Sequence, residues 1–229
     1  MTTEQKFEAM TTFTAAEMLA TCQKIHGTAR SKGWWTDGPD GRVLISEDDV
    51  DEKLFLVVTE LAEAFEEYRA SKGDDDLRKV YYIAPTSEPG KVAKFSAEEA
   101  SAILDITKAK PEGFPIEMAD AYIRILDLTG AVAPNLDLST VILYMTDADR
   151  YISKEFEKTT HMGRTMCEIT RALVTINDGD TVSVLKALFL ALGLIEVASK
   201  DLNFSLRSAI ELKMAYNDTR SFKHGGKRA

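Results

Sequence analysis

Apolar residues recur along this chain with the three- to four-residue spacing of amphipathic α-helices, and the two-residue alternation typical of strands is scarce. The pattern predicts helices at residues 15–32, 46–71, 115–131, 138–158, 163–176, 181–200 and 206–217. Thr14 and Ser46 stand where the first two helices begin and can cap them, and Gly33 follows the end of the first. Because the connections are short, we expect an all-α helical bundle.

One stretch, residues 73–109, departs from the helical pattern. It predicts one short strand at residues 80–83, a turn at 85–90 and a helix at 96–107 that Ser96 caps, with Glu99 three residues later. We therefore expect an irregular insert within a single domain that covers residues 1–229.

Composition narrows the class of protein. A chain of 229 residues with 45% hydrophobic content can bury a large core. Its two cysteines, Cys22 and Cys167, lie far apart, which suits a reducing compartment. The chain does not begin with a signal-like apolar segment, and we see no run of about 18 apolar residues, so we expect a cytoplasmic protein with no membrane contact. The net charge of −9 argues against binding to nucleic acids.

Two pairs of acidic residues stand out within apolar surroundings: Glu60 with Glu63, and Glu117 with Asp120. A three-residue spacing places both members of a pair on neighbouring faces of one helix, so we expect the acids to line a cleft. Buried carboxylates need a counter-cation, and Mg²⁺ prefers oxygen ligands and bridges to phosphates. A di-iron site is less favoured, because no histidine follows these glutamates by three residues. The alternative is a solvated acidic face with pairs such as Asp120 with Arg124.

Basic residues gather near the C-terminus of this otherwise acidic chain. The cluster comprises Lys213, Arg220, Lys223, His224, Lys227 and Arg228. Lys213, Tyr216 or Asn217, and Arg220 follow one another by three or four residues, so one helical face can present them to a phosphorylated ligand. The alternative is a solvated tail.

Together, these motifs resemble the MazG-like all-α nucleotide pyrophosphohydrolases, the group that includes dimeric dUTPases and dCTPases. The resemblance rests on the two acidic pairs, the Gly33-Trp34-Trp35 loop, the segment 110–127, Lys213-x-x-Tyr216-Asn217-x-x-Arg220 and His224-Gly225-Gly226-Lys227. It covers residues 14–72, 110–132 and 203–228. It implies hydrolysis of a nucleoside triphosphate between its α- and β-phosphates with Mg²⁺, for which Mn²⁺ could substitute.

The resemblance also implies roles for individual residues. Glu60, Glu63, Glu117 and Asp120 would be the metal ligands, and Glu63 would orient or deprotonate the attacking water. The residues implied to bind substrate are Trp34, Trp35, Lys213, Tyr216, Asn217, Arg220, Lys223, His224 and Lys227. The tryptophans are candidates for stacking on the base, although either could instead fill the core. Base and sugar preference stay open.

The chain departs from the family pattern in three places. Thr59 stands where the fuller motif has a glutamate adjacent to Glu60, which leaves the number of metal ions open. The insert at 73–109 separates the two acidic pairs, and an extra helical segment, at about residues 137–202, precedes the C-terminal motif.

The extra segment contains a faint echo of the first half. Residues 167–173 resemble residues 59–65 and keep an acid at Glu168, whereas Arg171 replaces the second acid, and Leu185 and Leu188 stand at the positions of the other acidic pair. If this degenerate repeat is genuine, the extra segment would mimic a second subunit and complete a four-helix core within one chain, as an intramolecular pseudo-dimer. Otherwise the resemblance implies a homodimer, since members of the family normally dimerise. Chance likeness between amphipathic helices is the alternative.

Two alternatives to an enzyme stay open. One is a non-catalytic helical protein that binds a metal or nucleotide, and the other is a structural oligomer.

Overall fold

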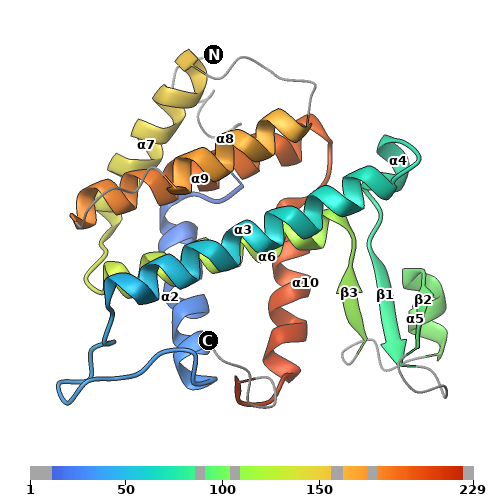
Figure 1. Ribbon diagram of the computed structural model, residues 1–229, viewed down its shortest axis with the longest axis horizontal. Coiled ribbons are helices and arrows are strands. Elements are labelled where there is room, and N and C mark those ends of the chain that lie inside the picture. The colour runs from blue at the N-terminus through green and yellow to red at the C-terminus, as the bar shows by residue number, and fades with distance from the viewer. Residues whose placement is uncertain (1–11, 86–90, 104–108, 156–161, 175–179, 224–229) are drawn as a thin grey trace.

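The computed structural model describes residues 12–85, 91–103, 109–155, 162–174 and 180–223. Helices dominate it, as predicted (Figure 1). They are α2 (Ala15–Ser31), α3 (Glu47–Ala70), α4 (Asp74–Leu77), α5 (Ala97–Ile103), α6 (Phe114–Val132), α7 (Leu138–Glu155), α8 (Met162–Val174), α9 (Thr181–Asp201) and α10 (Leu206–Thr219).

The first two long helices begin where the capping residues predict. Thr14 and Glu17 form a reciprocal capping box at the start of α2, and Ser46 and Asp49 form another at the start of α3. Gly33 follows the end of α2 with a φ of 80°, which a residue with a side chain rarely adopts. These local signals fix the loop that carries the two tryptophans.

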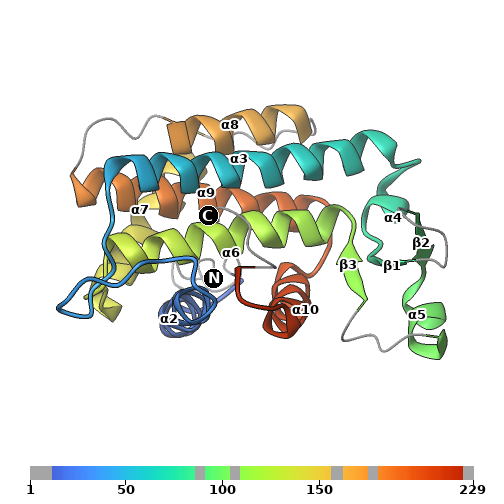
Figure 2. The ribbon, with the colours of Figure 1, turned by 60° about the horizontal axis from the view of Figure 1, so that its bottom comes forward.

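Four helices form the centre of the molecule. α3 packs on α6 and α8 packs on α9, while α3 also contacts α8 and α6 contacts α9. Figure 2 shows α3 and α8 together in one layer, above α6 and α9. α2, α7 and α10 complete the bundle, with α2 and α10 packed on α6 and α7 packed on α9. Because α6 is covered from several sides, polar residues on it must face other helices or an internal cavity.

The two halves of the bundle share one pattern of contacts. In the first half α2 and α3 pack on α6, and in the second half α7 and α8 pack on α9. Leu185 and Leu188, which stand where the first half has acids, are buried, and Glu168 forms an ion pair with Arg171 on the same helix. No observation tests the repeat itself, so the intramolecular pseudo-dimer stays a prediction.

A buried hydrogen bond joins the two halves. The Tyr122 hydroxyl on α6 donates to Glu196 Oε1 on α9 at 2.7 Å, and the backbone N–H of Thr12 donates to Glu196 Oε2 at 2.8 Å. Burial raises the pKa of the Glu196 carboxyl, and these two donors partly offset that rise. The bond fixes how α6 lies along α9.

The insert is more ordered than its sequence suggests. It contains two strands, β1 (Tyr81–Pro85) and β2 (Val92–Phe95), and a third, β3 (Lys110–Glu112), follows directly after it. The three strands pair antiparallel in the order β2-β1-β3. β1 confirms the strand predicted at residues 80–83, whereas β2 and β3 were not predicted. β2 and β3 are short. β2 contains Lys94 and β3 contains Pro111, so pairing with β1 is what makes them strands, and β3 is far from β1 in sequence. Most of the predicted 85–90 turn and the end of the predicted 96–107 helix lie outside the described residues.

The sheet connects directly to the core. β3 ends at Glu112, and Gly113 turns the chain into α6 with a φ of 110°. A Cβ on Gly113 would lie 2.6 Å from the carbonyl oxygen of Lys79, so glycine is required both by conformation and by space. This turn brings Glu112 beside the first turn of α6, where Glu117 lies.

Among the described helices, α9 is the one that is long and apolar enough to cross a membrane. We expected no run of this kind. The position of α9 explains its composition, because it packs against α6, α7 and α8 and buries Leu188, Leu192 and Ile195 in the core.

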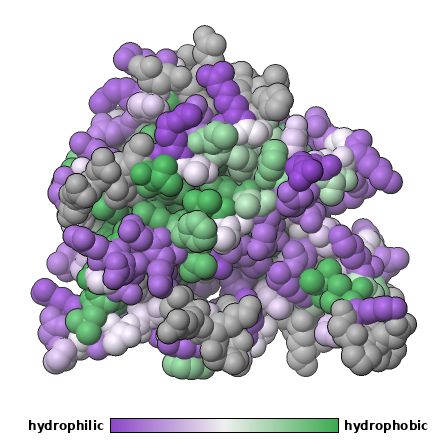
Figure 3. All heavy atoms as spheres, in the orientation of Figure 1, coloured by the Kyte–Doolittle hydropathy of each residue, from purple (hydrophilic) through white to green (hydrophobic). Residues whose placement is uncertain are grey.

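Part of the hydrophobic surface of the bundle faces outward. In the view of Figure 3, hydrophobic side chains gather over α3 and α8, and polar side chains surround them. Phe55 on α3 is 68% exposed and Val174 on α8 is 63% exposed. The apolar faces of these two helices are therefore not fully covered by the described residues.

Candidate metal centre and adjoining cavity

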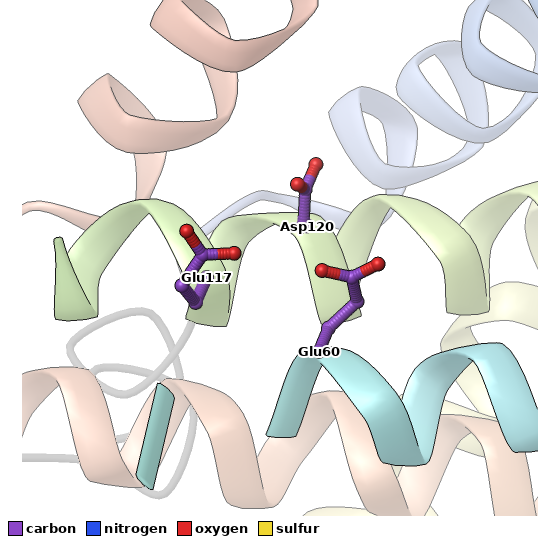
Figure 4. Close-up of side chains that lie close together, drawn as sticks. All are labelled: Glu60, Glu117 and Asp120. Carbon is purple, nitrogen blue, oxygen red and sulfur yellow. The ribbon is translucent and has the colours of Figure 1, made fainter. Parts of the chain in front are cut away.

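Three acidic side chains meet between α3 and α6. Glu60 comes from α3, and Glu117 and Asp120 come from successive turns of α6; one oxygen from each lies within 4.8 Å of the others. Figure 4 shows the three carboxylates close together, with Glu60 reaching from α3 to α6. Glu60 is 6% exposed and Glu117 is 2% exposed, so this is a buried cluster and not a solvated acidic face.

Glu63, the fourth acid of the predicted set, lies outside this group of three. It is exposed on α3 and lines an open groove of about 380 Å³ together with Glu67, Glu112 and Glu117. Three helical residues turn the chain by about 300°, so when Glu60 points at α6 the side chain of Glu63 lies to one side of it. Glu117 lines the groove and also belongs to the cluster, and so connects the two.

Glu117 is the most strongly perturbed carboxyl of the cluster. Burial, followed by a hydrogen bond with Glu112, raises the pKa of Glu117 to about 9. The pKa of Glu112 is lowered, because the hydrogen bond from Glu117 and the contact with Lys110 outweigh the effect of burial. Glu117 therefore carries the shared proton at neutral pH. Its Oε1 is buried and has no hydrogen-bond partner among the described residues, which leaves an acceptor that a cation could satisfy.

Two basic side chains contact the other acids of the cluster. Arg124 Nη2 lies 2.6 Å from Glu60 Oε1, and Lys213 Nζ lies 2.5 Å from Asp120 Oδ2. The predicted alternative pairing of Asp120 with Arg124 is not formed. Burial raises the pKa of Glu60, and the Arg124 guanidinium opposes that shift. Lys213 was expected to face phosphate, but its side chain is only 3% exposed and is held inside the bundle.

A cavity of about 310 Å³ begins at the acid cluster. It lies between α2, α3, α6 and α10, and Asp120 is one of its walls. Its walls also include Trp34, Lys53, Arg124, Asp127, Asn217 and Arg220. Three of the predicted substrate residues, Trp34, Asn217 and Arg220, therefore share one cavity with a member of the acid cluster.

The other predicted substrate residues are placed differently. Trp35 is 8% exposed and packs into the core, so it matches the core-filling alternative. Tyr216 stacks with the Arg220 guanidinium, 5.8 Å from its ring centroid. Lys223 donates its backbone N–H to the Lys32 carbonyl oxygen at 2.9 Å. His224 and Lys227 lie outside the described residues.

The side chain of Asn217 contributes an unpaired hydrogen-bond acceptor to the cavity. Its Oδ1 is buried and has no hydrogen-bond partner among the described residues, and its side chain lines the cavity. A ligand that donates a hydrogen bond there would satisfy it.

Lys53 and Asp127 were not among the predicted site residues, yet both line the cavity. Asp127 Oδ1 accepts a hydrogen bond from Trp35 Nε1 at 2.8 Å and lies 2.9 Å from His26 Nδ1. Burial lowers the pKa of Lys53, and nearby Asp127 partly offsets that shift. The spacing of these residues in the sequence could have indicated their place. Lys53 precedes Glu60 by seven residues and Asp127 follows Asp120 by seven, so each lies two helical turns from an acid and on the same face.

Comparison of the chain with protein-family models, with curated proteins and with solved structures gives no match. The resemblance to MazG-like pyrophosphohydrolases therefore rests on the motifs in the sequence.

Proposed function

We propose that this protein is a Mg²⁺-dependent nucleotide pyrophosphohydrolase that converts a nucleoside triphosphate to its monophosphate and pyrophosphate, a housekeeping reaction of the nucleotide pool. The observation that carries the proposal is the meeting of Glu60, Glu117 and Asp120 beside a cavity of nucleotide size. The cavity walls combine an aromatic face at Trp34 with the guanidinium of Arg220. These are the groups that a base and a phosphate chain require.

The donor set fits Mg²⁺. Glu60, Glu117 and Asp120 would hold the ion through carboxylate oxygens, and the unpartnered Oε1 of Glu117 is an acceptor already in place. When bound, Mg²⁺ supplies charge neutralisation at the phosphoanhydride.

We retain Glu63 as the residue that orients or deprotonates the attacking water. It is exposed to solvent in the groove that Glu117 also lines. No ion pair among the described residues involves Glu63, and an exposed carboxylate is a type of group that can position a water for attack.

The basic residues have two tasks in this proposal. Without a bound metal, Arg124 balances the charge of Glu60 and Lys213 balances that of Asp120. Arg124 also lines the cavity, so its guanidinium can turn from Glu60 to a phosphate oxygen once another cation balances the acid. Arg220, on the α10 side of the same cavity, would bind the phosphate chain.

A second candidate function has an observation in its favour. Because Arg124 and Lys213 already neutralise two of the three acids, the cluster is stable as a salt-bridge network without metal. A non-catalytic helical protein that binds a nucleotide in the cavity would look the same.

The two functions differ in turnover. The test is pyrophosphate release from a panel of ribo- and deoxynucleoside triphosphates with Mg²⁺, with Mn²⁺ and with a chelator. We expect turnover that requires the metal and falls about 100-fold or more in Glu63→Gln and Asp120→Asn. Glu52→Gln removes an exposed charge from the same helix as Glu63 and should leave turnover unchanged. Nucleotide binding without pyrophosphate release would favour the second candidate, and full activity in both site variants would refute the assigned residues.

A further inference from the structure

The cavity has a second end, away from the acid cluster. Asp120 and Asp127 both line it from α6, and they are seven residues apart. At 1.5 Å per residue, this spacing covers about 10 Å along the helix, roughly the reach of a nucleoside from its 5′-phosphate to the far edge of its base. If the phosphates lie at Asp120, as the proposed function requires, the base edge lies at Asp127.

The carboxylate of Asp127 is held in one orientation. Its Oδ1 accepts the Trp35 Nε1–H at 2.8 Å and contacts His26 Nδ1 at 2.9 Å. The indole N–H can only donate, so Oδ1 is committed as an acceptor on the core side. In the described residues Oδ2 has no hydrogen-bond partner, and the side chain lines the cavity. Asp127 therefore presents one free acceptor to a ligand.

A donor stands close to this acceptor. Lys53 lines the same cavity, with its Nζ 4.7 Å from the centroid of the Trp35 ring and 5.9 Å from that of Trp34. The two aromatic rings hold the ammonium group at this end of the cavity. Trp34 adds an aromatic face in the same place. The base end thus combines an acceptor, a donor and a stacking surface.

We propose that Asp127 and Lys53 read the edge of the base and select nucleotides with an exocyclic amino group beside a ring-nitrogen acceptor, as in cytosine and adenine. The amino group donates to Asp127 Oδ2, and the ring nitrogen accepts from Lys53. Uracil, thymine and hypoxanthine present the reverse order, with a carbonyl oxygen towards the carboxylate and an N–H towards the ammonium. Such a mismatch leaves both protein groups unpaired.

The test compares nucleotides that differ only in this pair of groups. Calorimetric titration would measure the binding of dCMP against dUMP and of dAMP against dIMP, which need no turnover. We expect the amino member of at least one pair to bind about tenfold more tightly or better. Equal affinities in both pairs, or no binding of any of the four, would overturn the inference.

One substitution should abolish the preference. In Asp127→Asn, the amide oxygen must stay towards the Trp35 N–H, so the amide nitrogen turns to the cavity and offers a donor. The ratio should then shift towards dUMP and dIMP by about tenfold or more. Asp218→Asn removes the same charge from an exposed position on the same cavity and should leave the ratio unchanged. An unchanged ratio in Asp127→Asn would contradict the proposal.

Two further comparisons keep the outcomes separate. Circular dichroism checks that Asp127→Asn is folded; if it is not, Lys53→Met replaces it, and the affinity ratio of the pair should fall towards one. If Lys53→Met leaves the affinity ratio of the amino and oxo nucleotides unchanged, the inference is overturned. Amino selectivity without pyrophosphate release would refute the hydrolase proposal and leave the base inference standing. Turnover without amino selectivity would refute the base inference and leave the hydrolase proposal standing.

Discussion

Replacing Glu117 with glutamine should stabilise the metal-free protein, and more so as the pH rises. The native protein holds a proton on Glu117, with a pKa of about 9, that the unfolded chain loses near its ordinary value of 4.5. Wild-type stability is therefore fully present below about pH 4.5 and falls as the pH rises towards 9. Glutamine cannot ionise, and its amide N–H can still donate to Glu112. Glu117→Gln removes the pH-dependent loss without removing the hydrogen bond.

The size of the effect follows from the pKa of Glu117. Between its ordinary value of 4.5 and pH 7.5 lie about three pH units, and each is worth about 1.36 kcal/mol, which gives an upper limit of about 4 kcal/mol. Because the proton is shared with Glu112, we expect about half of this, ~2 kcal/mol in the free energy of unfolding. For a chain of 229 residues this corresponds to a rise in Tm of about 4–8 °C.

Urea unfolding followed by circular dichroism, in a chelating buffer at pH 5 and pH 7.5, measures the effect. The variant should exceed the wild type clearly at pH 7.5 and only slightly at pH 5. Glu52→Gln, on an exposed position, should change stability by less than about 0.5 kcal/mol at both. A gain that is equal at the two pH values, or a less stable variant at pH 7.5, would refute the buried, protonated state of Glu117. Mg²⁺ should then stabilise the wild type more than the variant, because metal binding releases the proton.

Three further substitutions test the packing around the site. Tyr122→Phe removes the buried donor to Glu196 and should lower the free energy of unfolding by about 2 kcal/mol in urea; no loss would mean that the bond does not join the halves. Gly130→Ala would place a Cβ 2.6 Å from His26 Cβ, so calorimetry should show a loss of about 1–3 kcal/mol, and a neutral change would contradict the close approach of α2 and α6. Lys213→Met leaves a largely buried carboxylate without its ammonium and should cost about 2–4 kcal/mol without metal, less with Mg²⁺; equal losses in both conditions would argue against a metal there.

The helices were predictable because their signals are local. Apolar spacing places each long helix, and Thr14 with Glu17 and Ser46 with Asp49 mark where α2 and α3 begin. The sheet was not predictable in the same way. β3 is three residues long and contains Pro111, so its pairing with β1 depends on the fold that surrounds it.

The acid cluster was predictable in part. Sequence spacing identifies acids on one side of a helix, and the fold brings Glu60 to Glu117 and Asp120. Spacing does not resolve the rotation of about 60° that sets Glu63 apart from Glu60, since both belong to the same broad face. The counter-cation Lys213 comes from α10, far along the chain, so only the packing of α10 on α6 could identify its partner.

The shared contact pattern of the two halves has a consequence for how the protein would behave at low concentration. When a four-helix core forms between two chains, dilution separates them and abolishes any site that the core supports. Here α3, α6, α8 and α9 belong to one polypeptide, so only unfolding can part them. If the proposed activity is present, its specific value would then stay constant across dilution. Since the second half keeps only Glu168 of the four acids, a lesion in the first half has no duplicate site to compensate for it.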